Sequence, residues 1–351
     1  MASSQMTKPT VDDLSVLGVA GLVLAAGKGT RMKSSLPKVL HPVAGRPMLD
    51  WTLTTLARIG VKSVGVVVSD DQPNLLSFLN QRKELCVAVQ KNRQGTGDAV
   101  AAATTLFAGV KPPPYAAGHK VQGSPITCDY ILIMAGDVPA VQSESLLDFV
   151  RDAREHSADL AVLGMRVPKP RGYGRMVTRG SELLAIVEEK DADAATRSID
   201  LCNTGIIFAR VDVLFAALQL LTPNNAQNEY YLTDCVQHAR TLGFRVCAHE
   251  AADWQEFGGV NDRAQLADAE SWLMARKRRE LMLSGVTLRL SDSIYIEEDV
   301  VIGADSIIES GCHLSGKTKV GSGCVIGAGS VLKNTVVASG ERVPPLSVLI
   351  S

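Results

Sequence analysis

The chain has 351 residues, of which 46% are hydrophobic and 21% are charged, and its formal net charge at pH 7 is −1. This composition can bury ordinary cores, and the length suits about two domains. A net charge so close to zero gives no support to nucleic acid or an anionic membrane as the main partner.

The N-terminal region has a polar stretch followed by an apolar run, Leu14 to Gly27. The run is shorter than the ~20 residues that span a bilayer. A secretory signal needs a positive leader, but here Asp12 and Asp13 outweigh Lys8. The seven cysteines are dispersed without a CxxC pair, which fits free thiols in a reducing compartment. We therefore expect a polar tail over residues 1–17 and a cytoplasmic protein.

Strand-like apolar runs alternate with helix-like segments over residues 18–262. The runs are continuous in Val, Ile and Leu, which is typical of a mainly parallel sheet covered on both faces, so the predicted class is α/β. Helices are expected within residues 45–60 and 143–157, and a Pro- and Gly-rich surface loop over residues 109–128. The expected strands are GLVLAA, SVGVVVS, YILIMAG, ADLAVLGMRV and TGIIFAR.

The period of the sequence changes in its last part. A connecting helix is expected over residues 263–284, and residues 285–351 then repeat in hexads. Such hexads resemble the short left-handed parallel β-helix, in which each unit forms one face of a triangular coil. Seven hexads before Pro344 and Pro345 make about two and a third coils, whose unburied ends should pack against copies of the chain. The hexads begin at Ile296, Ile302, Ile308, Leu314, Val320, Ile326 and Leu332.

The stretch GLVLAAGKGTRMKSSLPKVLH, residues 21–41, joins an apolar strand to a glycine-rich, basic turn. Gly27 and Gly29 let backbone N–H groups approach an anion, and a following helix N-terminus would favour negative charge. Arg31 can fork onto phosphate oxygens, and Lys38 adds a point charge. The stretch predicts phosphate binding, and the alternative is a tight strand–helix turn with surface cations.

The same stretch resembles the signature of sugar-1-phosphate nucleotidylyltransferases. It is similar above all to the uridyltransferase domain of the bifunctional bacterial enzymes that make UDP-N-acetylglucosamine. The resemblance implies a Rossmann-like nucleotidyltransferase domain that uses UTP, a sugar 1-phosphate and Mg²⁺. Seven further segments continue it in order: VQKNRQGTGDAV, MAGDVPAV, GYGRMV, IVEEKDAD, NTGIIFA, NNAQNEYYLTD and GGVNDR.

The resemblance also implies a role for each matched residue. Arg31 and Lys38 would carry the triphosphate and the incoming sugar phosphate. Asp137 and Asn261 would hold Mg²⁺. The uracil end of UTP would be bound by Leu24, Ala25, Gly27, Gln90, Gly95 and Thr96. The sugar would be bound by Gly174, Glu188, Asn203, Tyr231 and Thr233.

Residue chemistry is compatible with these roles. The Gln90 amide can pair with the edge of uracil, which donates and accepts on neighbouring atoms. Asp137 directly follows the strand YILIMAG, at the sheet edge where open α/β sheets bind ligands, although an Asp there is often only a helix cap. A sugar 1-phosphate is already ionised, so it can attack the α-phosphorus of UTP in line without a general base. The protein then aligns two anions and neutralises their charge.

Several features depart from the family pattern. Ala135 stands where an aromatic residue often precedes Gly-Asp, and Asp98 stands where His is common. The segment over residues 109–128 is longer than usual. The β-helix lacks the coils that carry the family's acetyltransferase, and His313 fits a packed or exposed histidine better than a catalytic one. We therefore expect a single-function uridyltransferase that assembles as a homotrimer through its β-helix.

The leading hypothesis is transfer from UTP to N-acetylglucosamine 1-phosphate, and the rival with the same chemistry uses another sugar such as glucose 1-phosphate or N-acetylmuramic acid 1-phosphate. Tyr231, Thr233 and the segment NNAQNEYYLTD favour an N-acetyl hexosamine. A non-catalytic nucleotide-sugar-binding protein is the alternative from another class. A pure binder has no need for both metal ligands, so the intact set argues against it. A β-helix acyltransferase would need more coils.

Overall fold

The computed structural model describes residues 14–116 and 119–351, so most of the tail expected over residues 1–17 lies outside the described residues. The described residues divide into two compact units. The first comprises the chain up to Leu40 and Met48–Asn261, and the second comprises His41–Pro47 and Asp262–Ser351. Within the described ranges, no helix combines the length and apolar character needed to cross a bilayer.

The first unit is built on one ten-stranded sheet with the order β6-β5-β4-β1-β7-β11-β8-β12-β10-β9. β4, β1 and β7 are parallel neighbours, as the apolar runs predicted, and β5, which was not predicted, pairs parallel with β4. β11 runs antiparallel to both β7 and β8, so the sheet is mixed beyond β7. The strands are β1 (Val19–Leu24), β4 (Val64–Ser69), β5 (Leu85–Gln90), β6 (Lys120–Gln122), β7 (Tyr130–Ala135), β8 (Leu160–Arg166), β9 (Arg175–Arg179), β10 (Glu182–Val187), β11 (Leu201–Arg210) and β12 (Val246–Glu250).

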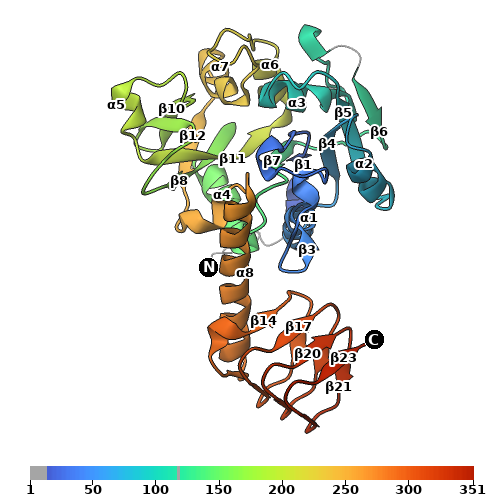
Figure 1. Ribbon diagram of the computed structural model, residues 1–351. Coiled ribbons are helices and arrows are strands. Elements are labelled where there is room, and N and C mark those ends of the chain that lie inside the picture. The colour runs from blue at the N-terminus through green and yellow to red at the C-terminus, as the bar shows by residue number, and fades with distance from the viewer. Residues whose placement is uncertain (1–13, 117–118) are drawn as a thin grey trace, which may run out of the picture. The chain divides into compact units, whose positions relative to one another are not determined.

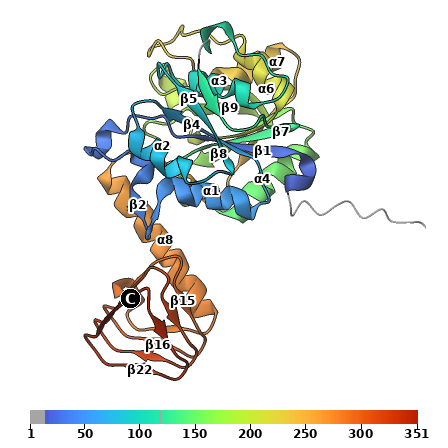
Figure 2. The same cartoon turned by 90° about the vertical axis from the view of Figure 1, so that its right-hand side faces the viewer.

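Helices cover both faces of this sheet, as Figures 1 and 2 show for α1, α2 and α4 on one side and α3, α6 and α7 on the other. Each face has its own core: Leu56 and Phe149 belong to one, and Val100 and Val213 to the other. The α/β class is therefore confirmed. The helices are α1 (Met48–Arg58), α2 (Pro73–Asn80), α3 (Thr96–Ala102), α4 (Ser143–Glu155), α5 (Ala194–Arg197), α6 (Val211–Leu218) and α7 (Cys235–Thr241). Short 3₁₀ turns are η1 (Leu14–Leu17), η2 (Thr30–Met32), η3 (Lys38–Leu40), η4 (Thr104–Leu106), η5 (Pro114–Ala116), η6 (Leu232–Asp234) and η7 (Trp254–Phe257).

Residues 109–116 and 119–128 contain secondary structure that the surface loop predicted from the Pro and Gly content does not include. They contain η5, and the strand β6 pairs antiparallel with β5 through Val89 and Lys120. The ring of Tyr115 stacks on that of Tyr230 with centroids 4.0 Å apart. The three side chains of β6 are exposed, so backbone pairing defines this strand and no hydrophobic alternation announces it.

The second unit contains the hairpin of β2 (Pro42–Val43) and β3 (Arg46–Pro47), the helix α8 (Arg263–Leu283), the turn η8 (Ser291–Ser293) and a parallel β-helix. The β-helix strands stack in three sheets, β13-β16-β19-β22, β14-β17-β20-β23 and β15-β18-β21 (Figures 1 and 2). They are β13 (Thr287–Leu288), β14 (Tyr295–Ile296), β15 (Val301–Ile302), β16 (Ile307–Ile308), β17 (His313–Ser315), β18 (Lys319–Val320), β19 (Val325–Ile326), β20 (Val331–Lys333), β21 (Val336–Val337), β22 (Arg342–Val343) and β23 (Val348–Ile350).

The β-helix is longer than the hexads starting at Ile296 predicted. Stacks of four, four and three strands make nearly four coils, because β21, β22 and β23 continue past Leu332. The interval from Leu332 to Val337 is one residue short, which hides the later repeats from a strict count of six. Pro344 and Pro345 lie in a turn between strands and do not end the coil, so that part of the prediction was wrong.

Small residues let successive coils approach closely. A Cβ on Gly303 would lie 2.6 Å from the backbone nitrogen of Ser322 in the next coil. The fully buried Ser306 hydroxyl donates to the Gly321 carbonyl at 2.7 Å and accepts from the Cys324 N–H at 3.1 Å. Such bonds satisfy polar groups that the narrow core encloses.

Stacked apolar side chains fill that core, and Ile308 pairs in register with Leu288 on one side and Ile326 on the other. Ile308 is fully buried. We expect Ile308→Ala to destabilise the β-helix by about 2–5 kcal/mol, because it removes buried methyl groups and leaves a cavity. Hydrogen exchange of peptides from residues 286–343 should accelerate in this variant and remain nearly unchanged in Lys317→Ala, an exposed control. Unchanged exchange in Ile308→Ala would contradict the stacking described here.

Candidate active site

The glycine turn that follows β1 lies beside Lys38. Gly29 has φ +60°, and a Cβ there would lie 2.6 Å from the Cβ of Lys38, so glycine meets both the backbone and the packing requirement. The helix expected after the turn is only the 3₁₀ turn η2, Thr30–Met32. A helix dipole therefore contributes little here, and the charges of the side chains matter more.

Two side chains fix the path of this turn. The Gln72 amide donates to the carbonyl of Gly27 at 3.2 Å. The Arg93 guanidinium donates from Nε to the carbonyl of Ala26 at 2.8 Å and forms an ion pair with Asp71. These bonds leave the N–H groups of the turn, not its carbonyls, available for an anion.

A cavity of about 820 Å³ opens beside the turn, and residues from both halves of the sheet line it. Eleven of the fifteen residues singled out in the sequence line this cavity: Leu24, Ala25, Gly27, Lys38, Gln90, Gly95, Thr96, Asp137, Glu188, Asn203 and Thr233. The other four residues do not line the cavity. Gly174 and Asn261 bond to the lining residues Asn203 and Lys38, whereas Arg31 bonds to Asn261 and Tyr231 to Asp191. The structure thus brings most of the expected residues together around one space.

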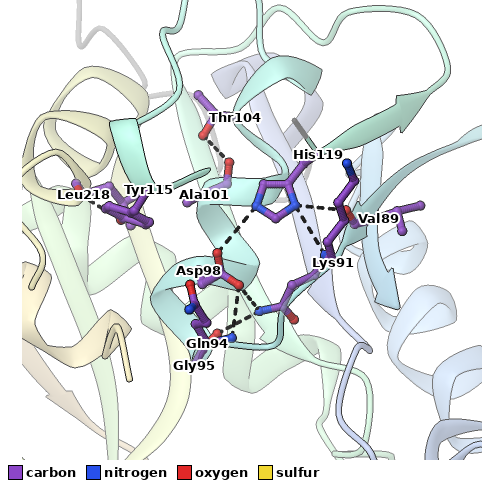
Figure 3. Close-up of polar contacts among 11 residues, drawn as sticks. Val89, Lys91, Gln94, Gly95, Asp98, Ala101, Thr104, Tyr115, His119 and Leu218 are labelled. Carbon is purple, nitrogen blue, oxygen red and sulfur yellow. Dashed lines mark hydrogen bonds and ion pairs between the residues drawn. The ribbon is translucent and has the colours of Figure 1, made fainter. Parts of the chain in front are cut away.

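Gln90, the last residue of β5, lines the cavity. Its Nε2 donates to Asp98 at 2.7 Å and to the carbonyl of Gly95 at 3.1 Å. Asp98 also accepts the backbone N–H of Gln94 at 3.2 Å and lies 3.5 Å from the imidazole of His119 (Figure 3). Burial would raise the pKa of Asp98, but hydrogen bonds from His119, Gln90 and Gln94 outweigh it and hold that pKa below its ordinary value.

The segment next to Gln90 is tied to a distant part of the chain. Gly95 has φ +105°, and a Cβ there would lie 2.5 Å from the carbonyl oxygen of Tyr230. The Gly97 N–H donates to this carbonyl at 2.7 Å, and the Thr96 hydroxyl accepts the Leu232 N–H at 3.1 Å. The part of the cavity lined by Gly95 and Thr96 is therefore fixed to the segment that carries Thr233.

Lys38 lies between two groups at the carboxyl edge of the sheet. Its Nζ forms an ion pair with Asp137 and donates to Oδ1 of Asn261 at 3.2 Å. Arg31 donates to the same Oδ1 at 3.0 Å. Two side-chain oxygens thus converge on one cationic nitrogen. Among the described residues, no group of three or more His, Cys, Asp or Glu forms a metal site without help from a ligand.

A carboxylate, that of Glu188, also lines the cavity. Glu188 accepts a hydrogen bond from the Thr233 hydroxyl at 3.1 Å, and the Gly174 carbonyl accepts the Asn203 N–H at 2.9 Å. A Cβ on Gly174 would lie 3.4 Å from both Glu188 oxygens, so this backbone is close to the carboxylate. The Tyr231 hydroxyl instead donates to Asp191 at 3.3 Å.

Comparison with known proteins identifies both units. Residues 21–200 match the MobA-like NTP transferase domain, and residues 299–334 match the bacterial transferase hexapeptide family. Proteins named "Bifunctional protein GlmU" are similar over most of this chain. The protein from Geotalea uraniireducens is 37% identical over 95% of this chain and 69% of its own length. That from Pelobacter propionicus is 39% identical over 94% and 68%.

The chain belongs to the GlmU family. It is a nucleotidyltransferase, because its first unit matches the NTP transferase domain over residues 21–200. The GlmU protein from Geobacter metallireducens is 39% identical, and the match covers 91% of this chain but 64% of that protein. The chain thus spans about two thirds of the length of these relatives, and the expectation of a single-function enzyme stays a prediction.

The fold of the first unit recurs in a solved structure of low sequence similarity. A crystal structure from Bacillus anthracis, provisionally described as a glucose-1-phosphate thymidylyltransferase in complex with a sucrose, matches 72% of this chain. The TM-score is 0.53 and the sequence identity is 18%, so this match concerns the fold alone.

Sequence reasoning missed several residues around the site of this GlmU-family chain. Arg93 and Asp71 line the cavity and hold the glycine turn, and Glu229 lines its far side. The cation of Arg93, within VQKNRQGTGDAV, was a usable signal. His119 carries no such signal by itself, because its partner Asp98 is distant in sequence and the composition of residues 109–128 predicts a surface loop.

The buried carboxyl group of Glu188 leads to a prediction about pH. Burial raises the pKa of Glu188, and the nearby carboxylates of Asp234, Asp191 and Glu229 raise it further, against the hydrogen bond from Thr233. A carboxyl with a raised pKa costs stability once it ionises. This cost grows as pH rises above the ordinary value of 4.5 and is complete above the pKa in the folded state.

Glu188→Gln keeps the shape without the charge. We therefore expect its melting temperature, relative to the unmodified protein, to rise between about pH 4.5 and neutrality. Thermal unfolding across this range measures the difference, and Glu155→Gln, at an exposed position of α4, is the matched control. A pH-independent difference for Glu188→Gln would show that the carboxyl is not destabilised by burial.

Proposed function

We propose that the chain transfers a uridylyl group from UTP to N-acetylglucosamine 1-phosphate, giving UDP-N-acetylglucosamine and pyrophosphate. The observation that carries the proposal is the position of Lys38. Its ammonium bonds with Asp137 and Asn261 beside one cavity, which the Gln90–Gly95 pair and the Glu188–Thr233 pair also line. These groups suit a ligand that carries a base, phosphates and a sugar.

The main obstacle to such a reaction is the repulsion between two polyanions. An ammonium group has three N–H donors, and Lys38 directs two of them to Asp137 and Asn261. The third can bind a phosphate oxygen without loss of the other two. Arg31, bonded to the same Asn261, adds a second positive charge nearby. These cations would lower the barrier by neutralising charge and aligning the sugar phosphate with the α-phosphorus.

The chemistry of Asp137 and Asn261 fits Mg²⁺. Both offer hard oxygen donors, and these already converge on the cation of Lys38. Mg²⁺ is usually held by one or two protein oxygens, with substrate phosphates and waters as its other ligands. When bound, it would neutralise charge on the triphosphate. Lys38 itself lies beside both of these oxygen donors and supplies positive charge at the same place.

The sugar end supports a hydroxyl-rich ligand with both donors and acceptors. Glu188 can accept from sugar hydroxyls while Thr233 holds it in place. Asn203 also lines the cavity, and its Oδ1 accepts the Gly205 N–H at 2.9 Å, which orients its amide. The names of the GlmU relatives support the same reaction class.

Pyrophosphate release tests the proposal directly. The purified protein with Mg²⁺ and UTP should release pyrophosphate with N-acetylglucosamine 1-phosphate, well above the rate with glucose 1-phosphate. Preference for another sugar 1-phosphate would keep the reaction class and reject the sugar. If no pyrophosphate is released with any sugar phosphate and nucleotide, catalysis is rejected and a binding protein is favoured.

The central ion pair should matter for rate more than for fold. We expect Lys38→Ala and Asp137→Ala each to lower kcat/KM by about 100-fold or more, since each removes charge stabilisation from the reacting phosphates. Pyrophosphate release measures the loss, and circular dichroism checks the fold. Lys62→Ala, at an exposed position before β4, should retain full activity. Unchanged turnover in either site variant would remove that residue from the mechanism.

We further propose that the chain assembles as a homotrimer through its β-helix. Val301 and Val336 occupy equivalent positions on β15 and β21, on either side of Lys319 of β18, and their exposed fractions are 57% and 75%. Exposed apolar side chains of this kind suit contact with another copy. Sedimentation equilibrium should give three times the monomer mass, and Val301→Asp with Val336→Asp should lower it. A monomer for the unmodified protein at micromolar concentration would rule the trimer out.

A further inference from the structure

The Gln90 side chain has only one amide orientation that its neighbours allow. One terminal atom lies 2.7 Å from the Asp98 carboxylate and 3.1 Å from the carbonyl of Gly95, and both of these groups accept hydrogen bonds. The atom between them must therefore be the nitrogen, Nε2. Both of its hydrogens are used, so Oε1 is the atom that Gln90 can offer to a ligand in the cavity it lines.

Asp98 is the group that enforces this orientation. Its side chain is 1% exposed, and it lies in the first turn of α3. Its hydrogen bonds from His119, Gln90 and Gln94 keep its pKa below the ordinary value, so it is an acceptor at neutral pH. An ionised carboxylate cannot donate to Oε1, which makes the reversed amide unfavourable.

His119 supplies a partner for the buried carboxylate from outside α3. Its Nε2 lies 3.5 Å from Oδ1 of Asp98, and its side chain is 6% exposed. Its Nδ1 lies 3.2 Å from the carbonyl of Val89, next to Gln90 on β5 (Figure 3). The neighbouring residue Lys120 pairs with Val89 in the sheet, so β6 holds the imidazole against β5.

We propose that Asp98 and His119 are positioning residues that hold Gln90 with Oε1 toward the cavity and thereby select the nucleobase. An acceptor at this position suits uracil, whose N3–H donates between two carbonyl oxygens. It opposes cytosine, whose N3 is itself an acceptor. The proposal rests on the proposed use of UTP, and it gives the segment over residues 109–128 a role in nucleotide choice.

Two variants of the full chain test the proposal, with His156→Ala as the matched control. His156 also lies beside an aspartate, Asp152, but is at the exposed end of α4. Asp98→Asn has nearly the same shape, yet its amide can donate to Oε1 or accept from Nε2. The reversed orientation of Gln90 then loses only the bond to the Gly95 carbonyl and becomes less unfavourable. His119→Ala removes the partner of Asp98, and His119→Gln restores a donor.

Calorimetric titration with UTP and with CTP measures the consequence. In Asp98→Asn and His119→Ala we expect UTP affinity to fall about tenfold while CTP affinity changes little, so that the preference for UTP falls by a similar factor. His119→Gln should recover part of it, and the KM for the sugar phosphate should stay unchanged. A purely structural role would instead lower both affinities together and leave their ratio constant.

A readout without nucleotide separates this proposal from the proposed function. The side-chain NH₂ protons of Gln90 should exchange slowly in the unmodified protein and faster in Asp98→Asn. An unmodified protein that binds no UTP would overturn the proposed function and, with it, base selection by Gln90. An unmodified protein that binds UTP, with a constant UTP-to-CTP ratio in folded Asp98→Asn and His119→Ala, would overturn the positioning role alone.

Discussion

Attraction at the ammonium of Lys38 joins parts of the chain that are far apart in sequence. Lys38 precedes Asp137 by 99 residues and Asn261 by 223, yet it bonds to both. The sheet makes this possible, because β1 and β7 are parallel neighbours and Leu24 pairs with Ala135 at their carboxyl ends. The segments that leave these two strands therefore meet at the same edge, where ligands bind in open α/β sheets.

A partly buried pair such as Lys38 and Asp137 contributes little to stability by itself. Removing two charges from water costs free energy that their attraction only partly returns. Lys38 and Asp137 retain exposed fractions of 13% and 17%, so both can exchange their partner for a ligand at modest cost. The arrangement is better suited to receiving an anion and a cation than to holding the fold together. Stability comes instead from the two apolar layers of the sheet.

Local patterns in the sequence predicted those parts of the structure that local chemistry determines. Gly29 and Lys38 lie in one short stretch, so their proximity could be inferred. Asp137 directly follows an apolar strand, so its position at the edge of the sheet could be inferred as well. The antiparallel direction of β11 depends on its pairing with β7 and β8. An apolar run does not indicate the direction of its strand, so this pairing could not be predicted. The hexad count failed for a related reason, because one short interval before Val337 changes the phase while the stacking continues. The association of Asn261 with Asp137 was available only through family resemblance, and the bond between Asn261 and Lys38 was not predicted.

The contact between Asp98 and His119 joins two parts of the chain whose relation the sequence does not show. Burying the Asp98 carboxylate to 1% exposure without a partner would cost folding free energy. In the sequence, nothing in the motif around Asp98 indicates that its partner is His119. In the structure, β6 adds a strand to the sheet edge and thereby brings an imidazole to that carboxylate. The contact between Asp98 and His119 is therefore one structural unit, formed by α3 and the residue that precedes β6. Its effect reaches Gln90 through a single hydrogen bond, because an amide bonded on its nitrogen side can present only its oxygen.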